Sequence, residues 1–111
     1  MSDIAELLKQ KFQDRLTGEM ESTLVDEINQ RIYWKPLTGR QQKIIQKAAE
    51  KSTAEGICMH VKTRALDQNG EAIFKDVALA GLMNDFDFSV ISGIFFAMTG
   101  TDLSVDDIEK N

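Results

Sequence analysis

The chain has 111 residues, of which 42% are hydrophobic and 28% charged, and its formal net charge is −5. This length suits one domain with one core, and the acidic balance argues against a binder of nucleic acid or anionic membrane, because both need a basic face. The only cysteine, Cys58, excludes an internal disulfide and favours a reducing compartment. The sequence shows neither a signal peptide nor an apolar run of the roughly 18 to 20 residues that a membrane span needs, so we expect a cytosolic protein.

Residues 2–16 are predicted to form an amphipathic helix. Apolar side chains recur there at every fourth position: Ile4, Leu8, Phe12 and Leu16. Such positions share one face of an α-helix, and Gly18 is suited to ending it. A helix of about four turns is marginal by itself in water, so we expect residues 1–18 to dock on the rest of the domain or on another chain.

The segment 19–37 fits two structures. A helix would align Met20, Leu24, Ile28 and Ile32 on one face. Against this, Ser22–Val25 and Arg31–Trp34 are rich in β-branched and aromatic residues, and the stretch between them is typical of a turn. We favour a short β-hairpin over the helix, with Trp34 as a core anchor.

Two helices are expected next, over residues 38–51 and 55–66. Thr38 is the N-cap candidate of the first helix. The polar and flexible run Ser52–Gly56 favours a break between the two helices over one continuous bent helix. The apolar positions are Ile44, Ile45, Ala48 and Ala49 in the first helix and Ile57, Cys58, Val61 and Ala65 in the second.

A turn and a shorter helix follow. Asp67–Gly70 ends in Asn-Gly, which suits a turn that needs a positive φ. The next helix is expected over residues 76–83, opened by Asp76 and broken at Asn84 and Asp85.

The most apolar stretch, residues 85–100, predicts a central helix. Asp87 is its N-cap candidate, and Gly100 suits the left-handed residue at its end. We therefore expect a mainly α fold of about five helices with a short N-terminal β-hairpin. Residues 19–104 would form one globular helical domain, followed by an acidic, fraying tail over 105–111.

No set of residues predicts catalysis or metal binding. Cys58 and His60 stand two positions apart, which on a helix points them to different faces, and zinc needs more ligands than this pair supplies. We expect Cys58 in the core and His60 on the surface. The chain is therefore predicted not to be an enzyme, with no catalytic, cofactor-binding or metal-binding residues and no cofactor.

The aromatic and methionine residues between positions 83 and 98 are the remaining signal. Their simplest interpretation is a core, and the alternative is a groove that accepts an apolar helix from a partner. The last helix is apolar over more than half of its circumference. We therefore expect self-association, a partner, or both.

The order of these elements resembles the tail assembly chaperones of long-tailed, siphophage-type bacteriophages. The likeness extends from Arg31 to Ser104 and rests on four stretches. These are IYWKPLTGR at 32–40, the helix end at 61–67, DQNGEAIF at 67–74, and the final helix with its exit MTGTDLS within 88–104. The third stretch is similar to the family's Asp-x-x-Gly-Glu-x-hydrophobic-Phe turn.

This resemblance implies a chaperone that binds the tape measure protein and keeps it soluble while tail tube subunits assemble around it. It implies a place in the host cytoplasm and not in the mature virion. From the acidic net charge we expect neither nucleic acid nor a membrane as a partner. An apolar groove would contact exposed helices of the tape measure protein. The expected contact residues are Phe88, Ile91, Ile94, Phe95 and Met98.

In this family a −1 ribosomal frameshift often adds a longer form, through which the tail tube protein is recruited. The chain ends Glu109-Lys110-Asn111, and the codons GAA-AAA-AAY would contain a slippery run. The nucleotide sequence of the gene tests this hypothesis, because GAG at Glu109 or AAG at Lys110 would remove the run.

Two other classes of protein stay open. A structural tail-completion or connector subunit would form a stable ring and be present in mature particles. A small cytosolic regulator acting on a host protein would not bind phage tail proteins.

Overall fold

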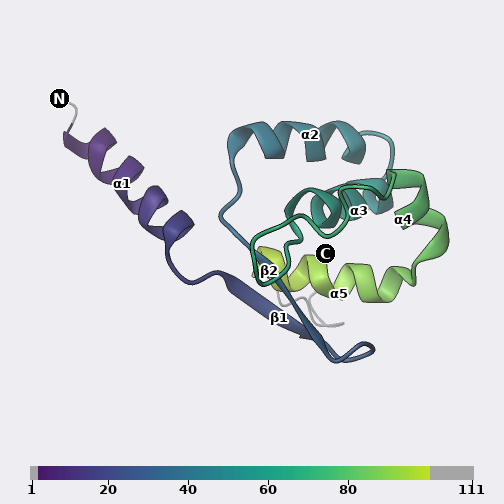
Figure 1. Ribbon diagram of the computed structural model, residues 1–111. Coiled ribbons are helices and arrows are strands. Elements are labelled where there is room, and N and C mark those ends of the chain that lie inside the picture. The colour runs from purple at the N-terminus through teal and green to yellow at the C-terminus, as the bar shows by residue number, and fades with distance from the viewer. Residues whose placement is uncertain (1–2, 101–111) are drawn as a thin grey trace, which may run out of the picture.

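The computed structural model describes residues 3–100, which form five helices and one two-stranded antiparallel sheet (Figure 1). In chain order the elements are α1 (Asp3–Thr17), β1 (Glu21–Val25), β2 (Gln30–Trp34), α2 (Gly39–Ala49), α3 (Thr53–Arg64), α4 (Leu79–Asp85) and α5 (Phe88–Thr99). The predicted mainly α fold with an N-terminal hairpin is confirmed. No helix within this described part is both long and apolar enough to cross a membrane.

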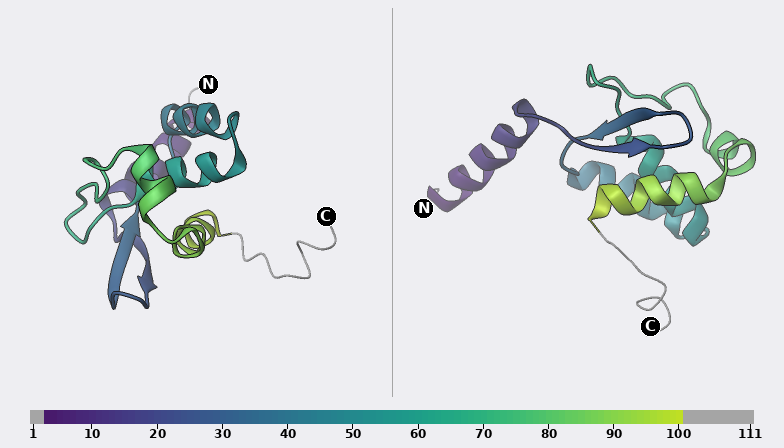
Figure 2. Two further views of the ribbon diagram at one scale, coloured as in Figure 1. Left: turned by 90° about the vertical axis from the view of Figure 1, so that its right-hand side faces the viewer. Right: turned by 90° about the horizontal axis from the view of Figure 1, so that it is seen from below.

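Helix α3 lies at the centre of the molecule. It packs between α2 on one side and α5 on the other and also contacts α4, while β1 lies against α5 (Figures 1 and 2). Cys58, Val61 and Ala65 on or next to α3 have no exposed surface, as their predicted apolar positions require. The rest of the core comes from Val25, Ile32, Trp34, Phe74, Leu82, Ile91, Ile94 and Met98.

The segment 19–37 is a hairpin, so the favoured interpretation is confirmed. Its strands pair from Glu21 with Trp34 to Val25 with Gln30, and Trp34 is buried, with its indole nitrogen donating to the Glu21 carboxylate at 3.2 Å. The Tyr33 backbone exchanges two hydrogen bonds with Leu66, at 2.9 and 2.8 Å. The hairpin is thereby joined to the end of α3.

The break between α2 and α3 is also confirmed. Thr38 caps α2 in a capping box with Gln41, and Ser52 caps α3 by accepting from the Glu55 amide at 3.0 Å. The two helices then approach closely where Gly56 faces Ala49. A Cβ atom built on Gly56 would lie 2.7 Å from the Ala49 Cβ, so this contact requires glycine.

The loop after α3 forms the predicted turn. Gly70 has a φ of +83°, and the Asp67 carboxylate accepts from the amides of Asn69 and Glu71 at 2.8 and 3.0 Å. The prediction that Asp76 opens the next helix is wrong, because α4 begins at Leu79. Residues 73–77 turn instead around the buried Phe74, whose carbonyl accepts from the Val77 amide at 3.0 Å.

The predicted break at Asn84 and Asp85 is wrong as well, because both residues belong to the last turn of α4. Helix α5 has both predicted caps. Asp87 accepts from the hydroxyl and then the backbone amide of Ser89, which together lower the pKa of Asp87, and Gly100 is left-handed with a φ of 69°. The predicted tail at 105–111 and the Glu109–Asn111 ending lie outside the described residues.

Helix α1 is set apart from the rest. It points away from the helical body (Figures 1 and 2), and none of its residues is buried. Only Phe12 and Leu16 among its apolar side chains are partly covered.

Two glycine substitutions test the role of the α2–α3 contact. Gly56→Ala should lower the free energy of unfolding by about 1–3 kcal/mol, because the new methyl group forces α2 and α3 apart. Gly93→Ala is the control, since Gly93 also lies within a helix but its Cβ would meet nothing within 4 Å. It should raise the free energy of unfolding by about 0.4–1 kcal/mol. Urea unfolding measures both, and equal effects of the two changes would contradict the close packing at Gly56.

Candidate functional site

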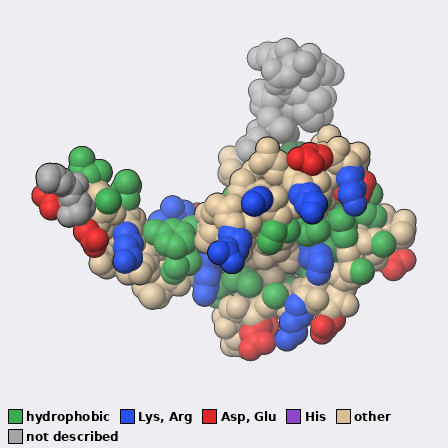
Figure 3. All heavy atoms as spheres, turned by 90° about the horizontal axis from the view of Figure 1, so that it is seen from above, with side chains coloured by type: hydrophobic (Ala, Val, Ile, Leu, Met, Phe, Trp, Pro, Cys, Tyr) green, Lys and Arg blue, Asp and Glu red, His purple; other side chains and the backbone are tan. Residues whose placement is uncertain are grey.

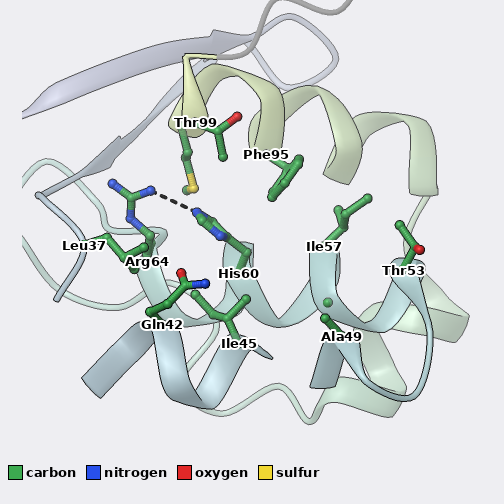
Figure 4. Close-up of a pocket in the computed structure, with 12 residues that line it drawn as sticks. Leu37, Gln42, Ile45, Ala49, Thr53, Ile57, His60, Arg64, Phe95 and Thr99 are labelled. Atoms are coloured by element: carbon green, nitrogen blue, oxygen red, sulfur yellow. Dashed lines mark hydrogen bonds between the residues drawn. The ribbon is translucent and has the colours of Figure 1, made fainter. Parts of the chain in front are cut away.

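A groove of about 590 Å³ opens between α2, α3 and the C-terminal half of α5 (Figure 4). Its lining residues are Leu37, Gln42, Ile45, Ala49, Thr53, Gly56, Ile57, His60, Arg64, Phe95, Met98 and Thr99. Leu37 and Arg64 lie at one end of the groove, and Thr53 lies at the other. The three helices therefore share a hollow long enough to have two distinct ends.

The walls of the groove are apolar, and each helix supplies part of them. Ile45 comes from α2, Ile57 from α3, and Phe95 and Met98 from α5. The Phe95 ring meets the His60 ring edge-on, with their centroids 5.0 Å apart. Ile45, Ile57 and Phe95 lie around the hollow (Figure 4) and can contact an apolar side chain that enters between them.

Arg64 places a cation at one end of this apolar groove. It is 8% exposed, and its two terminal nitrogens bond the Lys35 carbonyl at 2.8 Å and His60 Nε2 at 2.9 Å. Within residues 3–100 no carboxylate pairs with it, and its buried Nε has no acceptor. Burial lowers the pKa of Arg64, although the negative charge of Glu21 acts in the other direction and raises it. The guanidinium nevertheless stays protonated, as it does in proteins generally. Arg64 thus has no carboxylate partner within residues 3–100, and its Nε is buried there without an acceptor.

His60 is neutral in this arrangement. An arginine side chain only donates, so His60 Nε2 must accept, and the ring proton then resides on Nδ1. Burial, and next the charge of Arg64, lower the pKa of His60 to about 4. The prediction that His60 lies on the surface is wrong, since it is 5% exposed. The reason is that α3 is covered by helices on two sides, so a polar position on its second face is buried as well.

Cys58 points away from the groove into the core and is completely buried. Burial, together with the charge of Glu55, raises the pKa of its thiol, which makes it a weak nucleophile. Within the described residues no three His, Cys, Asp or Glu side chains are grouped so that they could hold a metal ion.

The residues expected to contact a partner are divided between three places. Phe95 and Met98 line the groove, Ile91 and Ile94 belong to the core beneath α5, and Phe88 is exposed at the start of that helix, outside the groove lining. Their role in binding stays a prediction.

The sequence reasoning missed the groove residues that α2 and α3 supply. Ile45 and Ile57 were assigned only to apolar stripes, and Arg64 was not singled out. One signal was available for Arg64, because it lies four residues after His60 and these positions are neighbours on a helix.

Comparisons of the chain with protein-family models, with curated proteins and with solved structures gave no match.

The neutral His60 predicts a pH dependence of stability. Its pKa is about 4 in the folded chain and about 6.5 when unfolded, so the unfolded chain binds more protons between these values. Stability should therefore fall as the pH drops from 7 towards 4, by at most about 1.4 kcal/mol per pH unit. His60 is the only histidine, so His60→Gln, which keeps an acceptor for Arg64, should flatten the curve between pH 7 and 5.

Urea unfolding of both proteins across this range measures the effect. If the stability of His60→Gln depends on pH as steeply as that of the parent chain, His60 is not buried in its neutral form.

Proposed function

We propose that this chain is a tail assembly chaperone of the phage kind, which binds an apolar helix of the tape measure protein and keeps that protein soluble. The observation that carries the proposal is the groove, whose walls are apolar and whose end holds an arginine with no carboxylate partner within residues 3–100. An α-helix with apolar residues at i, i+3, i+4 and i+7 is the typical occupant of such a hollow between helices.

The groove can also select among apolar helices. A bound helix with a carboxylate near the end of its apolar stripe would bring a negative charge close to the Arg64 guanidinium, which has no carboxylate partner within residues 3–100. Met98 and the aromatic ring of Phe95 give a wall that adapts to different side chains. This combination favours a client with acidic residues beside an apolar stripe over a purely apolar one.

The charge of the whole chain fits such a role. A net charge of −5 keeps a complex with an apolar client soluble through repulsion between complexes. The proposed site is a binding surface, so we place the chain among non-enzymatic proteins of the host cytoplasm. Recruitment of the tail tube protein, through a longer frameshifted form, belongs to the same proposal.

A second candidate function is a structural connector subunit of the tail. The observation that favours it is α1, which projects from the body with its apolar side chains uncovered, as expected for an assembly arm. A connector would remain in mature particles, whereas a chaperone would leave.

Loss of a groove wall should weaken client binding. Phe95→Ala should lower the affinity for the tape measure protein by about tenfold or more, because a buried aromatic contact is removed from the centre of the interface. Co-expression of the two proteins, followed by pull-down and size-exclusion chromatography, measures the soluble complex. Ile44→Ala is the matched control, since Ile44 is exposed on α2 outside the groove.

The chaperone proposal fails if the tape measure protein stays insoluble in the presence of the parent chain. The groove assignment alone fails if Phe95→Ala, still folded by circular dichroism, retains the client as well as Ile44→Ala does.

A further inference from the structure

Helix α1 carries an apolar stripe that the described part of its own chain does not cover. Ile4 is 74% exposed and Leu8 67% exposed, and Leu7 beside them is also exposed. A helix of 15 residues is marginal in water without packing on its apolar face. The stripe therefore requires a surface on which to dock.

The way α1 is attached directs this stripe outwards. Leu16, near its C-terminal end, borders a small hollow with Pro36 and Thr38. From there the helix runs away from the body, so its first two turns lie farthest from the groove of the same chain (Figures 1 and 2). The stripe is placed to meet another molecule.

We propose that the first half of α1 from one copy of the chain docks in the α2–α3–α5 groove of a second copy. The stripe supplies apolar residues at i, i+3 and i+4, namely Ile4, Leu7 and Leu8, which is the pattern that a groove between helices accepts. The groove supplies apolar walls of the same kind.

Charge selects this half of α1 and this groove. The first two turns of α1 carry Asp3 and Glu6 and no cation until Lys9, whereas the groove lining contains the cation Arg64 and no acidic residue. Figure 3 shows apolar side chains exposed on the projecting α1. Arg64 also lacks a carboxylate partner within residues 3–100, which Asp3, beside the stripe of the incoming helix, would provide.

The contact is heterologous, because the two partners use different surfaces. A pair of copies leaves one α1 and one groove open, so further copies add until a ring closes or a filament grows. This assembly needs no client and can be tested without one, but it uses the groove that the proposed function gives to the client helix, so α1 and the client would compete for it.

The test uses two variants of the full chain, each of which disables one half of the contact. Leu8→Lys puts a cation into the stripe, where it would have to be buried against the apolar walls of the groove. Gln42→Trp fills the groove from an exposed position. The controls are Gln13→Lys on the polar face of α1 and Ile44→Trp on the outer face of α2, both also exposed.

Light scattering coupled to size-exclusion chromatography, over a range of concentrations, measures the mass. The parent chain and both controls should form oligomers, and Leu8→Lys and Gln42→Trp should each be monomers, with the dissociation constant raised about tenfold or more. An equimolar mixture of the two monomeric variants should form a dimer and nothing larger. The intact α1 of Gln42→Trp then occupies the intact groove of Leu8→Lys, and no second contact is available.

Three outcomes would overturn the proposal. A parent chain that is monomeric at every concentration shows that no second copy enters the groove. Oligomers of Gln42→Trp as stable as those of the parent chain show that α1 docks elsewhere, for example on another α1. Two monomeric variants that stay monomeric when mixed, while both remain folded by circular dichroism, show that the contact does not run from α1 to groove.

Discussion

The burial of α3 on opposite sides is the constraint on which the rest of the structure depends. Its core face holds Cys58 and Val61 without exposed surface, and its second face has to receive α2 across the Gly56 contact. Because α2 and α5 both pack against this one helix, the space left between them is bounded on three sides by side chains. The groove thus arises because α2 and α5 pack against the same helix, α3.

The pairing of Arg64 with His60 is an unusual way to bury polar groups, because neither partner carries a negative charge. A neutral ring accepts from a guanidinium, and the buried Nε of that guanidinium has no acceptor in the described chain. Buried cations are normally paired, since desolvation costs several kcal/mol per ion. The chain tolerates this cost at the groove, where an arriving oxygen or carboxylate would recover part of it.

Local patterns predicted much of the fold and little of the site. The caps at Thr38 and Asp87 and the turn at Gly70 depend on a few neighbouring residues, which is why they could be inferred. The start of α4 could not, because it depends on the burial of Phe74 by distant parts of the chain. The groove joins α2, α3 and α5 from separate parts of the chain, so a single helix pattern could not show that Phe95 and Met98 border it while Ile91 and Ile94 do not.

The projection of α1 also affects how the molecule moves through solution. The radius of gyration is 15.4 Å, against about 13 Å for a compact chain of this length. A monomer of this shape has more drag than a sphere of equal mass and elutes early from a sizing column. Any packing that draws α1 against other atoms would reduce the drag per subunit. The hydrodynamic radius of an assembly would therefore grow more slowly than its mass, and elution volume alone would give a wrong number of copies.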